Sequence, residues 1–574
     1  MSFTFSVARL RQELAWPVLR ANLFAGITVG IVALPLSMAL AIASGVAPQH
    51  GLYTAIIAGI VTALCGGSRV NISGPTAAFV VILLPITHLY GLGGLVISGL
   101  MAGVILVAMG AAKLGRFIEV VPYPVTVGFT SGIAVVIATF QIKDFFGLEI
   151  ASLEGHYLQN LLGIVRALPT LHFADLFTGA VTLAVLLLWA RRKSGIPPQL
   201  IGLIVGTGLA WLMSLIFADF HVVTIGSRFQ YTIDGVAGSG IPPFAPAFVW
   251  PWELPDASGK PVGLSFGLLN TLLGSALAIA MLGALESLLC AVIADGMAGT
   301  RHDPNRELIG QGIGNIVAPF FGGVPATAAI ARTATNIRAG ATSPVSSVVH
   351  GVFILVAILL LAKLLAYLPM AALAALLLRV AWNMSEAKHF FRIVRVAPGD
   401  DKAILLTCFS MTVLFDMTVA VAVGISLAAL LFIRRSIEQA GSTRLKPHEH
   451  QRVEGLPDYV AIYDVNGPLF FGAAHKALKS LGDVGKDTRV VILDMPDVTM
   501  LDMTAIITLE ELTKHMARNR IHVIVNQLSQ RMITKLQRAG VAAPGGNVEF
   551  SSSLEQALVR ASELHVRLRT AMPV

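Results

Sequence analysis

The chain has 574 residues, of which 55% are hydrophobic and only 13% charged, and its formal net charge is +8. Soluble domains carry about 25% charged residues, so most of this chain does not face water. The positive charge does not indicate nucleic-acid binding, because the basic residues lie in short clusters between apolar segments. Cys65, Cys290 and Cys408 have no metal-ligand spacing, and we expect neither a metal nor another cofactor.

Apolar segments of membrane character follow one another from Asn22 to about Arg434, and we count fourteen. A helix that crosses a bilayer needs about 20 apolar residues, and several of these segments are shorter or interrupted by glycine and proline. The pattern is therefore compatible with fourteen spans, or with twelve spans and two re-entrant segments. The segments lie near residues 22–46, 52–66, 73–89, 93–112, 124–142, 173–190, 199–218, 266–294, 307–321, 326–338, 343–362, 367–383, 402–415 and 417–433.

Basic residues mark one side of the membrane. If the N-terminus is cytoplasmic, the even-numbered connections are cytoplasmic too, and these connections hold the basic clusters. The long connection at about 219–264 contains only Arg228 and Lys260 among several prolines. Because cytoplasmic loops are enriched in Lys and Arg, the sequence predicts an all-α, multi-pass membrane protein with both termini in the cytoplasm.

Two interrupted segments resemble each other. The first runs from Gly66-Gly67 through Ser73 to Thr76, and the second runs from Gly322-Gly323 to Arg332. They are the third and tenth of fourteen segments, so they hold the same place in two sets of seven, and sets of an odd number must be inverted in the membrane. Matched interrupted segments indicate the central site of a transporter. Aligning the two Gly-Gly pairs places Thr76 at the level of Arg332.

The second segment carries a full charge at membrane depth. Thr327 is a candidate N-cap, and Arg332 follows about one turn later. An intramembrane Arg costs at least about 2.5 kcal/mol on insertion scales, so it needs a partner or a function. Arg332 either pairs with an acidic neighbour or attracts an anionic substrate, together with the backbone N–H groups near Ala329 and Ile330.

Three hydroxyl residues and one carboxyl complete the candidate site. Ser73 is a candidate N-cap of the facing helix, and Thr76 follows it; both hydroxyls are also candidate substrate contacts. Ser37, beside the kink expected at Pro35, is a further candidate. Glu286 lies mid-way along an apolar segment, as either the structural partner of the cation or a proton-coupling group, and the two roles are compatible.

The composition changes after about Gly441, where strands alternate with helices. This alternation predicts a small α/β domain on the cytoplasmic side. The domain shows no Ser-His-Asp, Cys-His or phosphate-loop pattern, and we do not expect an enzyme. The expected strands lie near 459–465, 489–493 and 521–525, and the expected helices near 473–481, 504–516, 529–539 and 553–569.

The chain resembles the sulfate permease family of anion transporters along nearly its full length, and its C-terminal block is similar to that family's STAS domain. The stretches that carry the resemblance are residues 45–53, Ser73-Gly74-Pro75-Thr76 and the segments around Glu286 and Arg332. Within the family, three stretches are most similar to the bacterial aerobic transporters of four-carbon dicarboxylates: residues 128–132, 281–292 and 328–332.

The resemblance implies a seven-plus-seven inverted repeat with a substrate-carrying core domain, a gate domain, a homodimer and an elevator-type movement. It implies uptake of succinate, fumarate, malate or aspartate by proton symport across a bacterial inner membrane. Arg332 and Thr76 would then lie at the substrate, and Glu286 would be the proton-linked acid. The implied boundaries are a cytoplasmic segment at 1–21, a core at 22–114 and 266–362, a gate at 115–218 and 363–435, a linker at 436–455 and the STAS domain at 456–574.

Two other functions remain compatible with these residues. The same fold can host a sulfate or bicarbonate transporter or an anion exchanger, because all of these anions need a positive site. A membrane-anchored sensor, acting through a cytoplasmic protein partner of the STAS domain, is the alternative of another class. Antagonist-type STAS domains carry a phosphorylated Ser after the third strand, where this chain has Met503; we interpret the next residue, Thr504, as a helix N-terminal hydroxyl.

Overall fold

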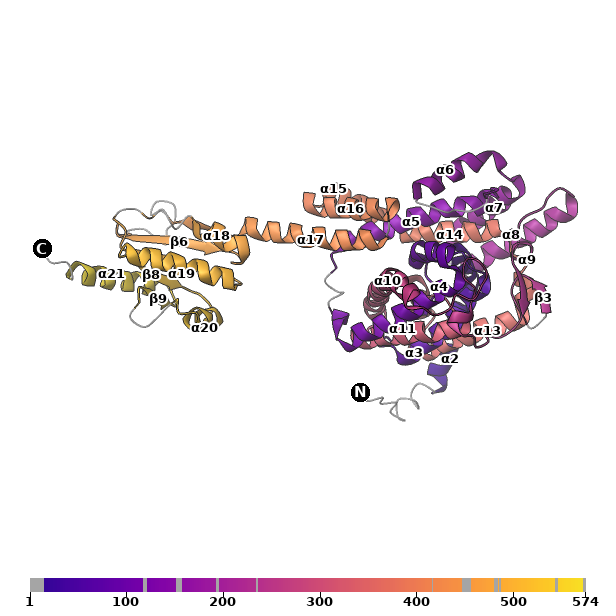
Figure 1. Ribbon diagram of the computed structural model, residues 1–574, viewed down its shortest axis with the longest axis horizontal. Coiled ribbons are helices and arrows are strands. Elements are labelled where there is room, and N and C mark those ends of the chain that lie inside the picture. Colours follow the sequence, from indigo (N-terminus) through magenta and orange to yellow (C-terminus); the bar gives the residue numbers. More distant parts are fainter. Residues whose placement is uncertain are drawn as a thin grey trace. The chain divides into compact units, whose positions relative to one another are not determined.

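The chain forms two compact units, Met1–Ser426 and Leu427–Val574, and the boundary falls within helix α17 (Met417–Gln439) (Figure 1). The expected linker residues 446–455 and the first fourteen residues of the expected N-terminal segment lie outside the described part of the chain. The computed structural model describes residues 15–116, 121–150, 157–192, 196–233, 236–415, 417–445, 456–479, 484, 487–541 and 546–570.

The first half of the larger unit is a series of apolar helices interrupted by a two-residue strand. Proline lies in the first turn of α2, α3, α5 and α8, where its missing N–H has no helical partner to lose. The third and fourth expected segments both lie within α4, and Gly91, with a φ of +66°, breaks the helix between them. The elements are α2 (Trp16–Ala43), α3 (Pro48–Cys65), β1 (Ser73–Gly74), α4 (Ala77–Ala111), α5 (Tyr123–Phe146), α6 (Tyr157–Ala167), η2 (Leu168–Thr170), α7 (Phe173–Trp189) and α8 (Pro198–Ile216).

The second half repeats this order of elements after a connection with little regular structure. Two helices lead again to a two-residue strand and a further helix. Ser265 caps α10 and Asp303 caps α11 through side-chain oxygens that accept backbone N–H bonds. The elements are α9 (Ile225–Arg228), β2 (Gln230–Ile233), β3 (Val236–Ser239), η3 (Pro251–Glu253), α10 (Phe266–Ala298), α11 (Pro304–Val317), η4 (Ala318–Phe321), β4 (Thr327–Ala328), α12 (Ile330–Arg338), α13 (Val345–Leu365), α14 (Met370–Met384), α15 (Ala387–Val396) and α16 (Gly399–Leu414), followed by α17.

Each of the fourteen expected apolar segments lies on a helix of the described chain. Among the described helices, seven are long and apolar enough to cross a membrane, or eight if the bent pair at 157–189 counts as one span. Others are shorter, such as α12 with 9 residues. The helices α6, α9 and α15 were not expected, because they are short and lack a continuous apolar run.

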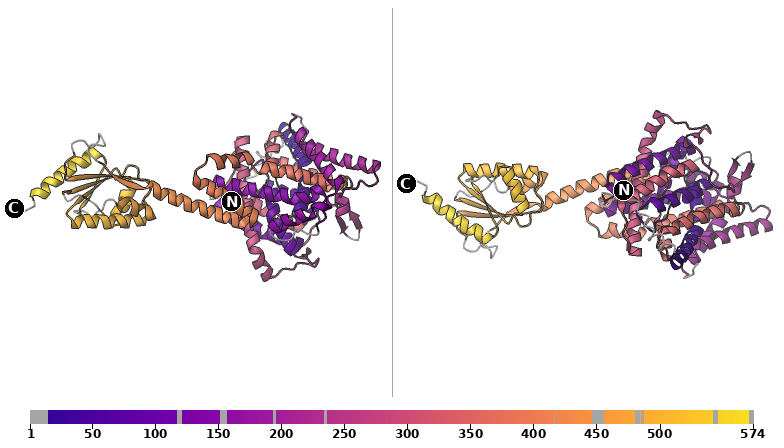
Figure 2. Two further views of the ribbon diagram at one scale, coloured as in Figure 1. Left: turned by 90° about the horizontal axis from the view of Figure 1, so that it is seen from above. Right: turned by 90° about the horizontal axis from the view of Figure 1, so that it is seen from below.

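The helices of the larger unit pack in two groups. In the first group, α4 packs on α10 and α11, α3 on α11 and α13, and α2 on α12 and α13. In the second group, α5 packs on α14 and α16, and α7 packs on α8 and α14. Figure 2 shows helices of the first half (indigo and purple) interleaved with helices of the second half (magenta to orange). Any site inside this bundle therefore draws residues from both halves.

The smaller unit is a five-stranded sheet with helices on both faces. The strand order is β5-β6-β7-β8-β9, with β5 antiparallel to β6 and the other pairs parallel. Because strand side chains alternate between faces, one set packs with α18, α19 and α20, and the other set packs with α21. The elements are β5 (Gly441–Arg444), β6 (Val460–Asn466), α18 (Phe471–Lys479), β7 (Val490–Asp494), α19 (Met503–Arg518), β8 (His522–Asn526), α20 (Gln530–Arg538), β9 (Val548–Ser551) and α21 (Leu554–Thr570).

Two strands of this sheet were not expected. The strand β5 covers residues that we placed in the linker, and β9 covers residues to which we assigned no element. Both are four-residue edge strands with polar residues, so they lack the apolar runs that predicted β6, β7 and β8.

Candidate functional site

The two interrupted segments meet in the interior of the larger unit. Ser73 pairs with Ala328, and Gly74 pairs with Thr327, in a two-stranded antiparallel ladder formed by β1 and β4. All four residues are buried. The third and tenth segments of the chain therefore meet at one hydrogen-bonded crossing. The sequence pattern predicted that the two segments form a common central site, but it did not predict their strand pairing.

A helix begins directly after each of these strands. Thr76 is the N-cap residue of α4, and Ala329 is the N-cap residue of α12; neither side chain accepts a capping hydrogen bond. By position Thr76 therefore corresponds to Ala329, and Arg332 lies in the first turn of α12. The alignment through the glycine pairs was wrong because the second crossover has fewer residues between its glycines and its helix.

The two residues expected as N-caps have other roles. The Thr327 hydroxyl donates to the Gly283 carbonyl oxygen (3.0 Å), and the Ser73 hydroxyl accepts from Nε2 of Gln311 (2.6 Å). Both N-cap predictions were wrong because each of the two segments stays extended for two to three residues beyond the expected start of its helix. These hydroxyls instead fasten the crossing to α10 and α11.

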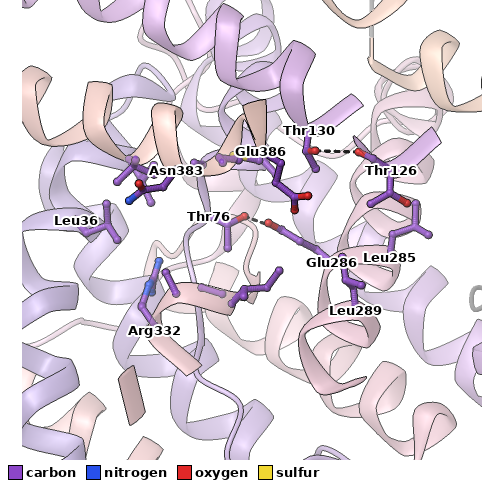
Figure 3. Close-up of a pocket in the computed structure, with 18 of the residues that line it drawn as sticks. Leu36, Thr76, Thr126, Thr130, Leu285, Glu286, Leu289, Arg332, Asn383 and Glu386 are labelled. Atoms are coloured by element: carbon purple, nitrogen blue, oxygen red, sulfur yellow. Dashed lines mark hydrogen bonds between the residues drawn. The ribbon is translucent and has the colours of Figure 1, made fainter. Parts of the chain in front are cut away.

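Both helix N-termini open into a cavity of about 760 Å³ (Figure 3). Within the described residues, no acceptor faces the N–H groups of Ile330 and Ala331 at the start of α12. A helix N-terminus carries partial positive charge, so two helix ends at one cavity favour an anion there. The lining residues include Val32, Leu36, Leu40, Thr76, Ala77, Ala78, Thr126, Phe129, Thr130, Gln199, Leu285, Glu286, Leu289, Ala329, Ile330, Ala331, Arg332, Asn383 and Glu386.

Arg332 lies beside the crossing with only 1% of its surface exposed. Its Nη2 donates to the Pro75 carbonyl oxygen, whereas Nε and Nη1 have no partner among the described residues. Gly74 makes room for the guanidinium, because a Cβ at that position would lie 2.5 Å from Nη1. Buried donors without acceptors are costly, so an acceptor that reaches them is stabilised.

Glu286 lies across Thr76 from Arg332 (Figure 3). Its Oε2 accepts a hydrogen bond from the Thr76 hydroxyl (3.0 Å), and the side chain is half-buried at the cavity wall. The direct pairing of Glu286 with Arg332, one of our two interpretations, does not occur among the described contacts. The adjacent residues Pro75 and Thr76 lie between the two charges, one contacting the cation and the other the carboxylate.

Two candidate residues lie away from the cavity. The Ser37 hydroxyl is buried without a described partner, and the Ser37 carbonyl lies against Gly51, on the α3 side of α2. Ser73 forms part of the crossing itself, is 2% exposed and does not line the cavity. The structure thus brings together five of the seven candidates, namely Thr76, Glu286, Ala329, Ile330 and Arg332.

The opposite wall of the cavity contains polar residues that sequence reasoning missed. Thr126 and Thr130 of α5, Asn383 of α14 and Glu386 after α14 all line it. The signal that was available is spacing, because Thr126 and Thr130 are four residues apart and so share one helix face.

The first crossover, which we define as residues 66–76, is held by the buried carboxylate of Glu307. This carboxylate is 3% exposed and accepts from the N–H groups of Gly67 (2.9 Å) and Ser68 (2.8 Å) and from Nδ2 of Asn71 (2.9 Å). Such charge-assisted bonds are stronger than neutral ones. Glu307 lies in the first turn of α11, and its local sequence does not distinguish it from a solvated residue.

The second crossover, residues 318–329, is held by neutral groups, two of which belong to α3. The Thr54 hydroxyl accepts from the Val324 N–H (2.7 Å), and Nδ1 of His50 contacts the Gly322 carbonyl oxygen (2.7 Å). Asn315 of α11 also holds this crossover, because its Nδ2 donates to the Ala326 carbonyl oxygen (2.8 Å) and its Oδ1 accepts from the Ala326 N–H (2.8 Å). The second crossover is therefore held by neutral groups of both halves, whereas Glu307 of the second half holds the first crossover.

The chain matches the models of two families. Residues 19–407 match the Sulfate permease family, and residues 450–557 match the STAS domain. The chain belongs to the sulfate permease family. It is 41% identical over 532 residues to YvdB of Bacillus subtilis (strain 168), which is named for sulfate transport, with 92% of this chain and 95% of the relative covered. It is 30% identical over 518 residues to the bicarbonate transporter BicA of Picosynechococcus, with 86% of each chain covered.

Solved structures show the same fold. The overall structure of SLC26A9 has a TM-score of 0.82 at 18% identity, over 99% of this chain and 96% of that one. The transmembrane domain of a cyanobacterial BicA has a TM-score of 0.58 at 28% identity, over 72% of this chain and 98% of that one. This member of the family is thus an anion transporter with the predicted seven-plus-seven membrane fold and a C-terminal STAS domain.

The STAS loop after β7 departs from a phosphorylation site. Asp502 caps α19, because its Oδ1 accepts from the Ala505 N–H (2.8 Å) and its Oδ2 from the Phe471 N–H (3.2 Å). Met503 is 64% exposed and has no hydroxyl. Thr504 lies in the first turn of α19, where we expected a helix N-terminal hydroxyl.

Proposed function

We propose that the protein is a secondary active transporter of small oxyanions, bound between the N-termini of α4 and α12. The observation that carries this proposal is the convergence of two uncapped helix ends at one cavity, beside the unpartnered donors of Arg332. A doubly charged anion gains from each of these positive groups at once, and the low-dielectric surroundings strengthen that attraction.

Sulfate is the substrate that we propose to test first. The relative with 41% identity is named for sulfate transport, and a second relative is a bicarbonate transporter. Four-carbon dicarboxylates (succinate, fumarate, malate and aspartate), which we expected from the sequence, are the second candidate. The observation in their favour is the cavity of about 760 Å³, which is larger than a single inorganic oxyanion needs.

We propose that Glu286 couples the anion to a proton. Its carboxylate faces the same cavity as the two helix ends, and its described polar contact is the Thr76 hydroxyl. When Glu286 is protonated, the cavity loses one negative charge and holds an anion more strongly. Proton and anion then bind together, which is the thermodynamic requirement for symport.

We propose that the helices around the crossing, residues 22–114 and 266–362, move as a core against a gate formed by residues 115–218 and 363–435. The support is that the cavity has one wall from α2, α4, α10 and α12 and the other from α5, α8 and α14. The proposal includes a homodimer in a bacterial inner membrane with cytoplasmic termini. Signalling to a protein partner of the STAS domain is compatible with it as a second role.

Uptake into liposomes tests the proposal. Purified protein is reconstituted, and radiolabelled sulfate uptake is measured with and without an inward proton gradient, with succinate and bicarbonate as competitors. We expect the proton gradient to drive accumulation of sulfate, and we expect either succinate or bicarbonate to inhibit it. Glu286→Gln should lose the gradient dependence but keep exchange. Sulfate accumulation that does not depend on the proton gradient in the parent protein would contradict the symport proposal. Sulfate uptake by Glu286→Gln that still depends on the gradient would contradict the proposed role of Glu286.

A further inference from the structure

The helix α15 presents an unpartnered basic stripe. It joins α14 to α16 and has 10 residues, which is about half the length that crosses a bilayer. Its inner face packs on the bundle: Phe390 lies with its ring centroid 5.2 Å from that of Phe409 in α16, and Ala387 and Val394 share this half-buried face. Because α15 lies between two apolar helices, it lies at a membrane surface.

The outer face of α15 combines positive charge with apolar side chains. Lys388, Arg392 and Arg395 are all exposed, and their spacing of four and three residues places them in one stripe. Phe391 and Val396 flank the stripe and are 58% and 78% exposed. A helix with Lys and Arg beside exposed apolar residues is typical of segments that lie in the bilayer interface.

No described carboxylate neutralises this stripe. Glu386, directly before α15, contacts Nδ1 of His389 (3.1 Å) and the Tyr123 hydroxyl (3.4 Å) instead. Asp400 and Asp401 begin the next helix, α16, and the described ion pairs do not include them. Three cations therefore face outward without an acidic partner among the described residues, and anionic lipid headgroups complement them in charge.

We propose that the outer face of α15 binds the headgroups of anionic phospholipids. The stripe supplies the charge complement, while Phe391 and Val396 enter the boundary between headgroups and acyl chains. This surface also has a connection to the cavity, because Glu386, which precedes α15 with a φ of +43°, lines the cavity wall.

Thermal unfolding of the full-length protein in detergent tests this without any transport assay. Phosphatidylglycerol should raise the unfolding temperature by several degrees, and phosphatidylcholine should raise it much less. The triple variant Lys388→Gln/Arg392→Gln/Arg395→Gln should lose most of the phosphatidylglycerol shift. The matched control removes Arg531, Lys535 and Arg538, an exposed stripe of the same spacing on α20 of the STAS domain, and should keep the shift.

Three outcomes would overturn the proposal. These are an equal phosphatidylglycerol shift in the parent and the triple variant, an equal loss in the α20 control, or the same shift from inorganic phosphate. If the triple variant does not fold, Arg392→Lys/Arg395→Lys keeps the charges and should keep the shift, whereas Arg392→Gln alone should reduce it. A shift produced by an acidic peptide but not by the lipid would assign the stripe to a protein partner instead. Failure of sulfate uptake would leave every one of these readouts unchanged.

Discussion

The two crossovers perform the same task with opposite chemistry. The first is held by a buried charge, Glu307, and delivers a neutral Thr76 to the cavity. The second is held by the neutral groups of Thr54, His50 and Asn315 and leads to the charged Arg332. The repeated backbone geometry therefore does not require repeated side chains. It requires partners for the backbone N–H groups that each crossover turns toward its neighbouring helices, since an unsatisfied buried group is costly.

Removing the carboxylate of Glu307, the charged anchor of the first crossover, should have the largest effect on stability. Glu307→Ala leaves the buried N–H groups of Gly67 and Ser68 without acceptors, and each unsatisfied group costs about 1–3 kcal/mol. We expect a fall in unfolding temperature large enough to reduce the yield of folded protein. Glu307→Gln retains one acceptor oxygen and should lie between the variant and the parent. An unfolding temperature of Glu307→Ala within one degree of the parent would contradict the assignment of Glu307 as the anchor.

Removing the delivered charge should affect binding more than stability. Arg332→Ala removes the guanidinium beside the helix ends, and hydrogen bonds to charged groups contribute about 1.5–3 kcal/mol. Sulfate affinity measured by calorimetry should therefore fall roughly 10- to 100-fold. Arg332→Lys keeps a charge but lacks the planar group that contacts Pro75, so its affinity should be intermediate. Near-parental affinity in Arg332→Ala would place the anion elsewhere.

Removing the hydroxyl of Thr54, a neutral anchor of the second crossover, should destabilise the fold less. Thr54→Val keeps the shape of the side chain but removes the acceptor for the Val324 N–H, at about 1–2 kcal/mol. The matched control is Thr62→Val on the same helix, because the Thr62 hydroxyl donates only to Ala58 within α3. We expect Thr54→Val to lower the unfolding temperature more than Thr62→Val does. Equal effects would show that the second crossover does not depend on this bond.

The sequence predicted a central site at the two interrupted segments because the signals for that site are local. Glycine and proline interrupt two apolar segments, and Arg332 and Glu286 are charges in apolar surroundings, so each stands out without a partner in view. The features that the sequence did not predict depend on residues far apart along the chain. Glu307 lies more than 200 residues from the crossover that it holds, and its local pattern is that of an exposed first turn. The helix starts at Thr76 and Ala329 were misplaced because the strand pairing, absent from any local pattern, extends each segment.

The smallest loss of stability is expected at Glu549, a partly exposed carboxylate of the STAS domain. It serves as a comparison for the buried carboxylate of Glu307. Both oxygens of Glu549 accept from Arg560 (2.7 and 3.0 Å), but each side chain is 34% exposed. The hydrogen bonds from Arg560 hold the pKa of Glu549 below its usual value of 4.5. The stabilisation is therefore fully present above pH 4.5 and is lost as the pH falls through the lower folded-state value.

Glu549→Gln should cost only about 0.2–1 kcal/mol at pH 7, because solvent screens exposed pairs. Amide hydrogen exchange in β9 and α21 of the full-length chain, corrected for intrinsic rates, should be faster in Glu549→Gln at pH 7. The difference from the parent should shrink below pH 4.5, and a difference that grows on acidification would assign the loss to another group.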